Sequence, residues 1–267
     1  MWRPHNIFVI RYLISRSAMT VLPRLCGAPK FIARTIVMSR LSVRTIASVF
    51  AILMPLAAAA DEGDFPIKAD DGTVVANHRV APELAGQIEK LPGVIVVGNP
   101  NGKVTLAEFY DLNCPYCRKA SADIAVLVRG NAELRLVLVP FPVLGIASIQ
   151  GSRVELAVAR LVPAQKFFDY HHKLYAGRGM IDGNRALEAA KAIGLDVAKV
   201  TKIANEDSIG AEMVAHVRLG NALAIQATPG FVINGVAIVG YPGSKALTNV
   251  IQSVQRCANV VCSGGTH

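Results

Sequence analysis

The 267-residue sequence lacks the features that would point to a disordered, repetitive or membrane-embedded protein. No stretch reaches the ~20 uninterrupted apolar residues that a membrane-spanning helix needs, and the nearest candidate, residues 46–60, is short. There is no internal repeat and no low-complexity linker. Hydrophobic residues make up 52 % of the chain, which is too many for a disordered protein. The sequence therefore predicts a protein with a substantial core.

Acidic residues are absent from the first 60 positions, which hold eight of the 28 Lys and Arg residues. The net charge of +9 therefore falls to about +1 once residues 1–60 are set aside. No basic patch stands out in the rest of the chain, so nucleic acid is excluded as an expected partner.

The order of residue types in this first segment is that of a secretory signal peptide. A basic stretch begins at Met38, residues 45–56 are apolar, and small residues at 57–60 are followed at once by acidic ones. We expect cleavage near Ala60 and a periplasmic or otherwise exported product, with residues 1–37 as an upstream extension. A mitochondrial transit peptide and an uncleaved membrane anchor are the alternatives.

Cysteine is scarce, and its distribution is informative. One of the five cysteines, Cys26, lies in the leader, which leaves an even number downstream. An even count in an exported protein favours disulfide chemistry. Cys257 and Cys262 are predicted to form a structural disulfide that staples the C-terminus, with free or intermolecular thiols as the alternative.

Hydrophobic periodicity predicts an alternation of strands and helices downstream of the leader. Between about residues 147 and 225 the strand patterns vanish and helical patterns dominate. Asn234-Gly235 is typical of a two-residue hairpin turn. Strands are predicted at 94–97, 103–110, 133–140, 231–233 and 236–239, and helices at 81–91, 116–128, 184–193, 206–224 and 244–257.

Three local predictions are more specific. Asp182 and Ser244 precede helical segments and are predicted to be their N-caps. The acidic, turn-rich residues 61–71 are expected to form a loose start to the mature chain. His171 and His172 lie in a helical stretch, and adjacent helical residues face different directions. We therefore expect them to be solvated and not to bind a metal.

The motif Cys114-Pro115-Tyr116-Cys117 directly follows a predicted strand and opens a predicted helix. Two intervening residues put both sulfurs within one helical turn, as a disulfide that opens and closes quickly requires. Free N–H groups and the dipole at a helix N-terminus stabilise a thiolate, and Pro115 suits the first helical position. We predict Cys114 to be the exposed nucleophile and Cys117 to resolve the mixed disulfide.

Metal binding is the alternative interpretation of this motif. Together with Cys257 and Cys262 the pair could complete a four-cysteine zinc site, and alone it could hold a soft ion such as copper. No Met-rich or His-rich tract supports either site, and a strand leading into the pair favours redox chemistry. We therefore expect neither a metal nor any cofactor beyond a redox-active disulfide.

Two segments together resemble the DsbA family of thioredoxin-like proteins. The first runs from Gly98-Asn99-Pro100 through Val104-Thr105-Leu106-Ala107-Glu108-Phe109-Tyr110-Asp111 to the Cys-Pro-Tyr-Cys motif, and the second is Thr228-Pro229-Gly230-Phe231-Val232-Ile233-Asn234-Gly235. Two matched motifs in the right order are more specific than a lone Cys-x-x-Cys. The resemblance implies an α/β protein with a thioredoxin-like fold and an inserted helical subdomain.

The resemblance also implies an organisation of the chain. Residues 1–60 would be the leader, 61–93 an N-terminal arm and 94–257 the DsbA-like domain, with the helical insert at about 147–225 and a tail at 258–267. Residues 68–91 could also be a small dimerisation arm, which isomerases use.

Further site residues are implied by the same resemblance. Pro229 is expected to be a cis proline that faces the cysteine pair. Thr228, Pro229 and Tyr116 are expected to contact substrate, although Tyr116 could equally be a plain surface aromatic. Glu108 is expected to be buried and to relay protons to and from Cys117, with an inert strand acid as the alternative.

These expectations describe a thiol–disulfide oxidoreductase. Most simply it would be an oxidase that donates the Cys114–Cys117 disulfide to newly exported or unfolded cysteine-containing proteins. A membrane redox partner, implied by the resemblance alone, would reoxidise it. A reductase or isomerase of the same fold is the main alternative, favoured by the Pro-Tyr dipeptide and by Thr228. A periplasmic metal-binding thiol protein is another.

Overall fold

The computed structural model describes residues 63–262. The predicted leader, its cleavage site near Ala60 and the possible anchor over residues 46–60 lie outside that range. Within residues 63–262, none of the helices combines the length and the apolar character needed to cross a membrane.

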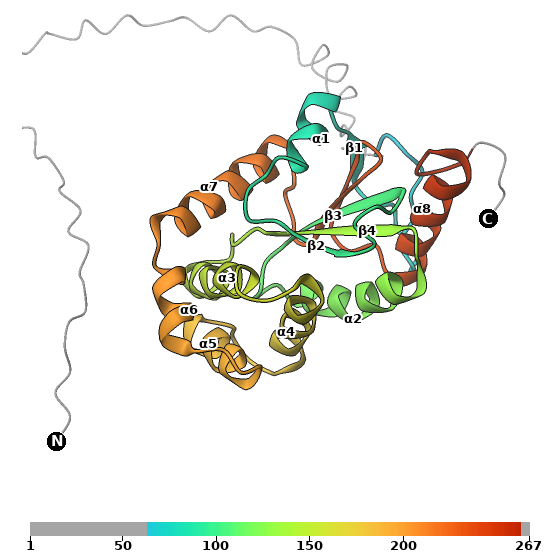
Figure 1. Cartoon of the computed structure of the whole chain (residues 1–267). Helices are drawn as coiled ribbons and strands as arrows, with labels where there is room; N and C mark the ends of the chain where they lie inside the picture. The colour runs from blue at the N-terminus through green and yellow to red at the C-terminus, as the bar shows by residue number, and fades with distance from the viewer. Residues whose placement is uncertain (1–62, 263–267) are drawn as a thin grey trace, which may run out of the picture. The chain divides into compact units, whose positions relative to one another are not determined.

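A mixed six-stranded sheet forms the centre of this region (Figure 1). Its strand order is β1-β6-β5-β3-β4-β2, and β3 pairs in parallel with β4 and antiparallel with β5. The strands are β1 (Asn77–Arg79), β2 (Ile95–Gly98), β3 (Val104–Tyr110), β4 (Leu134–Pro140), β5 (Gly230–Ile233) and β6 (Val236–Val239). The sequence predicted all of these strands except β1, with boundaries shifted by a residue or so.

The hairpin between β5 and β6 has the predicted two-residue turn. Asn234 and Gly235 both have positive φ, 47° and 73°, as a turn that continues the strand twist requires. Ile233 therefore pairs directly with Val236. This hairpin places residues 228–230 beside the end of β3, although more than 100 residues separate the two segments in sequence.

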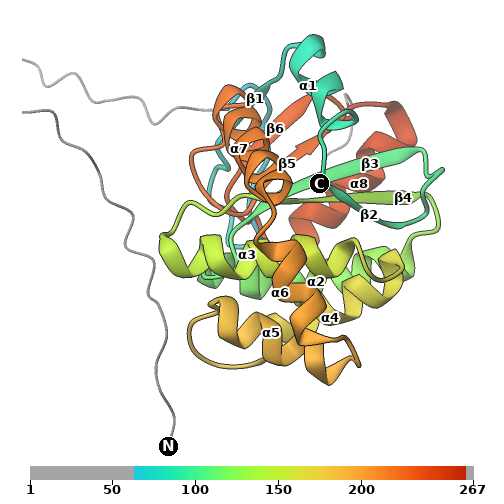
Figure 2. The same ribbon diagram turned by 60° about the vertical axis from the view of Figure 1, so that its left-hand side comes forward.

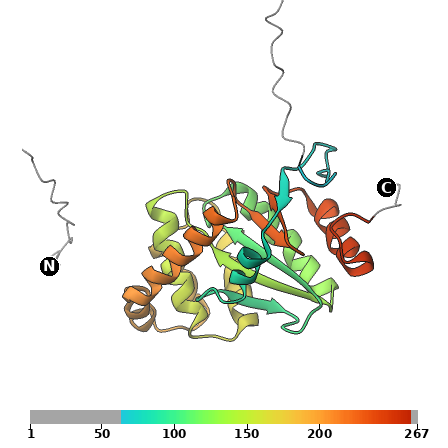
Figure 3. The ribbon, with the colours of Figure 1, turned by 90° about the horizontal axis from the view of Figure 1, so that it is seen from above.

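Alternation along the central strands divides the core between the two faces of the sheet. Ala107 and Phe109 of β3 face α1 (Pro82–Ile88) and α7 (Asp207–Ala222). Leu106 and Tyr110 face the other layer, which includes α2 (Pro115–Gly130) and α8 (Ser244–Cys257). Figure 3 shows α7 and α8 on opposite sides of the sheet.

The helical insert supplies the rest of this second layer (Figure 2). Its helices are α3 (Ile146–Ala159), α4 (Ala164–Ala176), α5 (Gly183–Ala192) and α6 (Val197–Ala204). The α/β fold with inserted helices agrees with the prediction, and Asp182 caps α5 through the N–H of Arg185 at 2.9 Å as expected. The insert is continuous with α7, which crosses to the opposite face.

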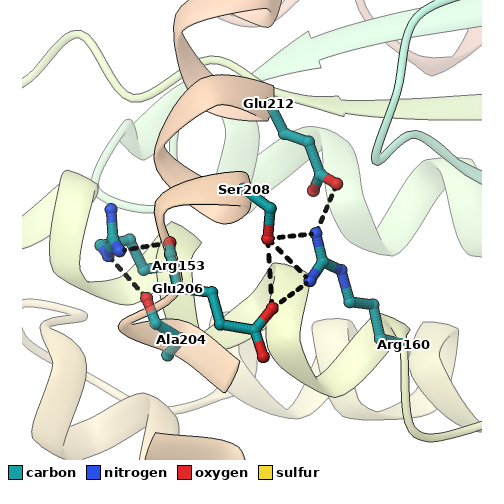
Figure 4. Close-up of polar contacts among 6 residues, drawn as sticks. All are labelled: Arg153, Arg160, Ala204, Glu206, Ser208 and Glu212. Atoms are coloured by element: carbon teal, nitrogen blue, oxygen red, sulfur yellow. Dashed lines mark hydrogen bonds and ion pairs between the residues drawn. The ribbon is translucent and has the colours of Figure 1, made fainter. Parts of the chain in front are cut away.

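Two arginines, Arg153 on α3 and Arg160 at its C-cap, fix the junction between α6 and α7 (Figure 4). Arg153 donates to the carbonyl oxygens of Ala204 at 2.7 Å and Glu206 at 3.0 Å. Arg160 pairs with the carboxylates of Glu206 at 3.0 Å and Glu212 at 2.5 Å. Because these contacts link three helices, they hold the insert in a fixed position against α7.

Two predictions about the chain ends of this region were wrong. Ser244 does not cap α8, because the carboxylate of Asp70 accepts the N–H groups of Lys245 and Ala246 instead, at 3.2 and 2.8 Å. The described part of the expected loose start, 63–71, is ordered against the core. Its Phe65 and Ile67 are buried, and β1 further along the predicted arm forms an edge of the sheet.

Candidate active site

The two cysteines of the Cys-x-x-Cys motif lie where the chain leaves β3 and enters α2. Cys114 is the N-cap residue of α2 and Pro115 occupies the first helical position. Both thiols are free in this structure. Cys114 is 5 % exposed and Cys117 is fully buried. The prediction that Cys114 is exposed was therefore wrong, although it is the more accessible of the two.

The thiol of Cys114 is poised to ionise. Its pKa is lowered to about 6, first because the Cys117 thiol donates a hydrogen bond to it, and also because of the Thr228 side chain and the N–H groups of Cys117 and Tyr116. Partial burial opposes these effects. A thiolate is the nucleophilic form of cysteine, so Cys114 can attack a disulfide at neutral pH.

Cys117 has the opposite character. Burial, the hydrogen bond with Cys114 and the charge of Glu108 raise its pKa far above the usual value of 9.0. Its Sγ accepts the backbone N–H of Asp111 at 3.5 Å. The pair thus combines one stabilised thiolate with one thiol that keeps its proton, as sequential attack and resolution require.

A loop from the second half of the chain lies against the nucleophile. The Thr228–Pro229 peptide bond is cis, and the Sγ of Cys114 donates to the Thr228 carbonyl at 3.0 Å. The structure thus brings Thr228 and Pro229 to the cysteine pair. Tyr116, between the two cysteines, is 63 % exposed and can meet an approaching molecule.

Glu108 lies on β3 below the pair, on the strand face that also carries Leu106 and Tyr110. It is buried, and burial raises its pKa to about 8, with smaller contributions from Glu155 and Cys114. Glu108 therefore carries a proton at neutral pH and can exchange it with a nearby group.

A second buried acid was missed by sequence reasoning. Glu155 on α3 accepts the Tyr110 hydroxyl at 2.8 Å and lies 2.6 Å from Nδ1 of His171 on α4. The prediction that His171 is solvated was wrong, because this buried carboxylate lies beside its ring. His172 is also largely enclosed, with Nδ1 2.7 Å from the Ser121 hydroxyl.

The other two cysteines of residues 63–262 lie far from the motif in sequence and are oxidised. Cys257 and Cys262 are joined by a disulfide at the end of α8, with their Cα atoms 5.9 Å apart. A zinc site built from all four cysteines is therefore contradicted. Among residues 63–262 no group of three or more His, Cys, Asp or Glu side chains is arranged to hold a metal ion.

Known proteins share this architecture. Residues 90–253 match the family model described as Thioredoxin. The chain is similar to the structure of a thioredoxin-like oxidoreductase from Silicibacter pomeroyi DSS-3, with 28 % sequence identity and a TM-score of 0.60 over 67 % of this chain and 99 % of that chain.

Two more distant structures show the fold alone. One is the thiol-disulfide exchange protein alpha-DsbA2 from Wolbachia pipientis, with 24 % identity and a TM-score of 0.59 over 64 % of this chain and 94 % of that chain. The other is the catalytic domain of Proteus mirabilis ScsC, with 23 % identity and a TM-score of 0.57 over 64 % and 95 %. No curated protein sequence matches the chain.

Proposed function

This chain belongs to the thioredoxin family, and from that premise we propose that it is an exported oxidase that passes the Cys114–Cys117 disulfide to cysteine-containing proteins. The predicted thioredoxin-like fold is confirmed, and the DsbA-like structure described above shares that fold. The protein is a thiol–disulfide oxidoreductase of this thioredoxin-like kind, and the direction of exchange and the compartment are our proposal.

One observation carries the choice of oxidase. Cys114 has a pKa of about 6 and Cys117 a pKa far above its usual value. A stabilised Cys114 thiolate exists only in the reduced protein, so it favours reduction of the disulfide and makes the oxidised protein a donor. A low-pKa thiol is also the better leaving group.

The proposed reaction has two exchange steps. A substrate thiolate attacks Cys114 Sγ, the bond to Cys117 breaks, and the Cys117 sulfur takes up a proton. A second substrate thiolate then attacks the substrate sulfur of the mixed disulfide. The substrate disulfide forms, and Cys114 leaves as a thiolate. A redox partner, proposed to be in the membrane, then removes two electrons from the pair.

Glu108 is proposed to supply the proton in the first step. Its pKa of about 8 means that it is protonated at neutral pH. Glu108 also interacts with Cys117, because its charge is one of the causes that raise the pKa of that thiol. Proton transfer within the buried site would avoid leaving an unpaired Cys117 thiolate away from water.

Exposed apolar side chains near the motif suit unfolded substrates. Tyr116, Leu144, Ile146 and Met180 are each at least half exposed. Leu144 and the segment beside Met180 are tied to the motif, since the Leu144 N–H donates to Asp111 and Ile181 N–H donates to Asn113. We propose that Thr228 and Pro229 contact the substrate backbone beside these side chains.

Export is proposed on two grounds. The leader has the residue order of a signal peptide, and the Cys257–Cys262 disulfide suits an oxidising compartment. A periplasmic thioredoxin-like protein from Salmonella enterica shares the fold at 21 % identity. The proposed boundaries are those given above, with cleavage near Ala60.

Equilibration with graded glutathione buffers tests the direction of exchange. The oxidase proposal predicts a reduction potential for the Cys114–Cys117 pair near about −120 mV. A value of about −180 to −230 mV would instead support the isomerase or reductase alternative. Cys114→Ser is the control, because it removes the pair and leaves the other disulfide. A tightly held ion, about one per chain, would support the metal-binding alternative.

A further inference from the structure

Asp111, the first residue after β3, has an unusual density of contacts for an acid outside the motif. It is fully buried, and it lies three residues before Cys114. Burying a carboxylate is costly unless every lone pair finds a donor. Its presence therefore calls for a compensating role.

The backbone of Asp111 contacts both cysteines. Its N–H donates to Cys117 Sγ at 3.5 Å, and its carbonyl accepts the N–H of Cys114 at 3.1 Å. The same carbonyl accepts the hydroxyl of Tyr175 at 3.1 Å. A shift of this one residue would therefore move the N–H group that contacts the buried sulfur.

The carboxylate of Asp111 fixes the backbone of this residue to neighbouring segments. Its Oδ1 accepts the N–H of Asn113 at 2.8 Å and the hydroxyl of Ser148 on α3 at 2.6 Å. Its Oδ2 accepts the N–H groups of Val143 and Leu144 at 2.8 and 2.9 Å. Four donors match a group that only accepts, and an asparagine amide would point donors at donors.

The segment that Asp111 holds is part of the exposed apolar surface near the motif. Val143 is 48 % exposed, Leu144 54 % and Ile146 74 %. This surface is thereby connected to the Cys117 sulfur, because the carboxylate of Asp111 holds segment 143–144 and the backbone N–H of Asp111 contacts that sulfur.

We propose that Asp111 is a positioning residue that couples the apolar segment 143–146 to Cys117 and holds the Cys117 sulfur in line to attack a mixed disulfide on Cys114. This inference rests on the proposed function, since it assigns a task in the reoxidation of the reduced pair, where Cys117 attacks a mixed disulfide on Cys114. It concerns the resolution step and not the initial attack by Cys114.

The resolution step can be observed with glutathione. Reduced protein attacks oxidised glutathione through the Cys114 thiolate, which releases one glutathione thiolate and leaves a mixed disulfide. Cys117 then gives up its proton to solvent or a neighbouring base and attacks Cys114 Sγ. The Cys114–Cys117 bond forms, the bond to glutathione breaks, and the second glutathione leaves as a thiolate that is then protonated.

The test compares both steps in the full chain and in Asp111→Asn by acid quenching and mass spectrometry. At about pH 8 the Cys114 thiolate is formed in either protein, since its pKa is about 6. We expect the initial attack to change by less than about threefold. We expect resolution to slow by about tenfold or more, because small misplacements of reacting atoms are costly, so the mixed disulfide accumulates.

Two further variants keep the test decisive. Asp196→Asn is the matched control, because Asp196 also accepts backbone N–H groups, from Ala198 and Lys199, but at the start of α6. It should leave both steps unchanged. Ser148→Ala removes one donor to Asp111 and keeps its charge, so it should slow resolution several-fold. It decides the matter by the same readout if Asp111→Asn does not fold.

The outcomes separate this inference from the function on which it rests. Resolution at the wild-type rate in folded variants, or equal slowing of both steps, would overturn the role of Asp111 alone. A wild-type protein that forms no mixed disulfide with glutathione would overturn the proposed function as well.

Discussion

One cysteine pair lies at the N-terminus of a helix and the other at the C-terminus of a helix. Cys114 and Cys117 open α2, whereas Cys257 is the last residue of α8 and Cys262 follows five positions later. The first pair is reduced in this structure and the second is a disulfide. Their chemistry differs because their surroundings do.

Helix polarity contributes to this difference, although the hydrogen bond from the Cys117 thiol is the largest cause of the low pKa of Cys114. At the start of α2, the N–H groups of Tyr116 and Cys117 help to lower the pKa of Cys114. At the end of α8, the carbonyl oxygen of Ser253 lies 3.1 Å from the Cys257 sulfur. The negative end of a helix disfavours a thiolate. The same residue type is thus suited to exchange at one end and to lasting linkage at the other.

Removing one pair or the other should give the largest contrast. Cys114→Ser should abolish exchange with glutathione, because Cys117, the other cysteine of the pair, is buried and keeps its proton. The double variant Cys257→Ser/Cys262→Ser should retain exchange at close to the wild-type rate. Rates of reaction with oxidised glutathione check both. Loss of exchange in the double variant would show that the two pairs are not independent.

Replacing Glu108, the buried acid beneath the first pair, should give the next largest effect, on the unfolding free energy. Its pKa is about 8 folded and about 4.5 in an ordinary environment. The unfolded chain therefore ionises first, and stability is lost as the pH rises from about 4.5 to about 8. Glu108→Gln should raise the unfolding free energy at pH 7 by up to about 3 kcal/mol.

Denaturant unfolding of the oxidised protein at several pH values measures this. Below about pH 4.5 the gain should vanish, because Glu108 is then protonated in both states. The same gain at every pH would mean that Glu108 does not titrate as a buried acid.

The C-terminal disulfide should matter for stability alone. It joins two cysteines that are five positions apart in sequence. The entropy of closing this short loop in the unfolded chain predicts that removing the disulfide lowers the unfolding free energy by about 2 kcal/mol. Buried Val260 lies within that loop. Denaturant unfolding of Cys257→Ser/Cys262→Ser measures this loss. A change in the reduction potential of the Cys114–Cys117 pair in the same variant would contradict the expectation that the C-terminal disulfide affects stability alone.

Thr228 provides the smallest and most local test. Its side chain is one of the groups that lower the pKa of Cys114. Thr228→Val removes the hydroxyl and keeps the shape, so the pKa of Cys114 should rise. Alkylation of Cys114 near pH 6 should slow by about two- to tenfold, the value of one hydrogen bond. An unchanged rate would assign the shift to the helix and to Cys117 alone.

The parts of this fold that local sequence determines were predictable. Asn234-Gly235 sets its own turn, and Asp182 caps the helix that follows it. Ser244 failed as a cap because Asp70, 175 residues before Lys245, supplies the acceptor. No local pattern reports a partner at that distance.

The site divides in the same way. The cysteine motif and Pro229 stand out as short patterns, whereas Asp111 entered the sequence analysis only as one residue of a segment that resembles the DsbA family. Its role depends on Val143, Leu144 and Ser148, which the fold alone brings to it. The position of His171 likewise depends on Glu155 from another helix. Contacts between separate segments are what the sequence leaves undetermined.

Alkylation of the native protein most directly tests the contrast between the pairs. The protein is treated with reduced glutathione and then iodoacetamide over about pH 4 to 9, and modified cysteines are identified by mass spectrometry. We predict that Cys114 reacts with a midpoint near pH 6, while Cys117 stays unmodified and Cys257 and Cys262 remain joined. A midpoint near the usual value of 9.0, or alkylation of Cys257 and Cys262 alongside Cys114, would contradict this account.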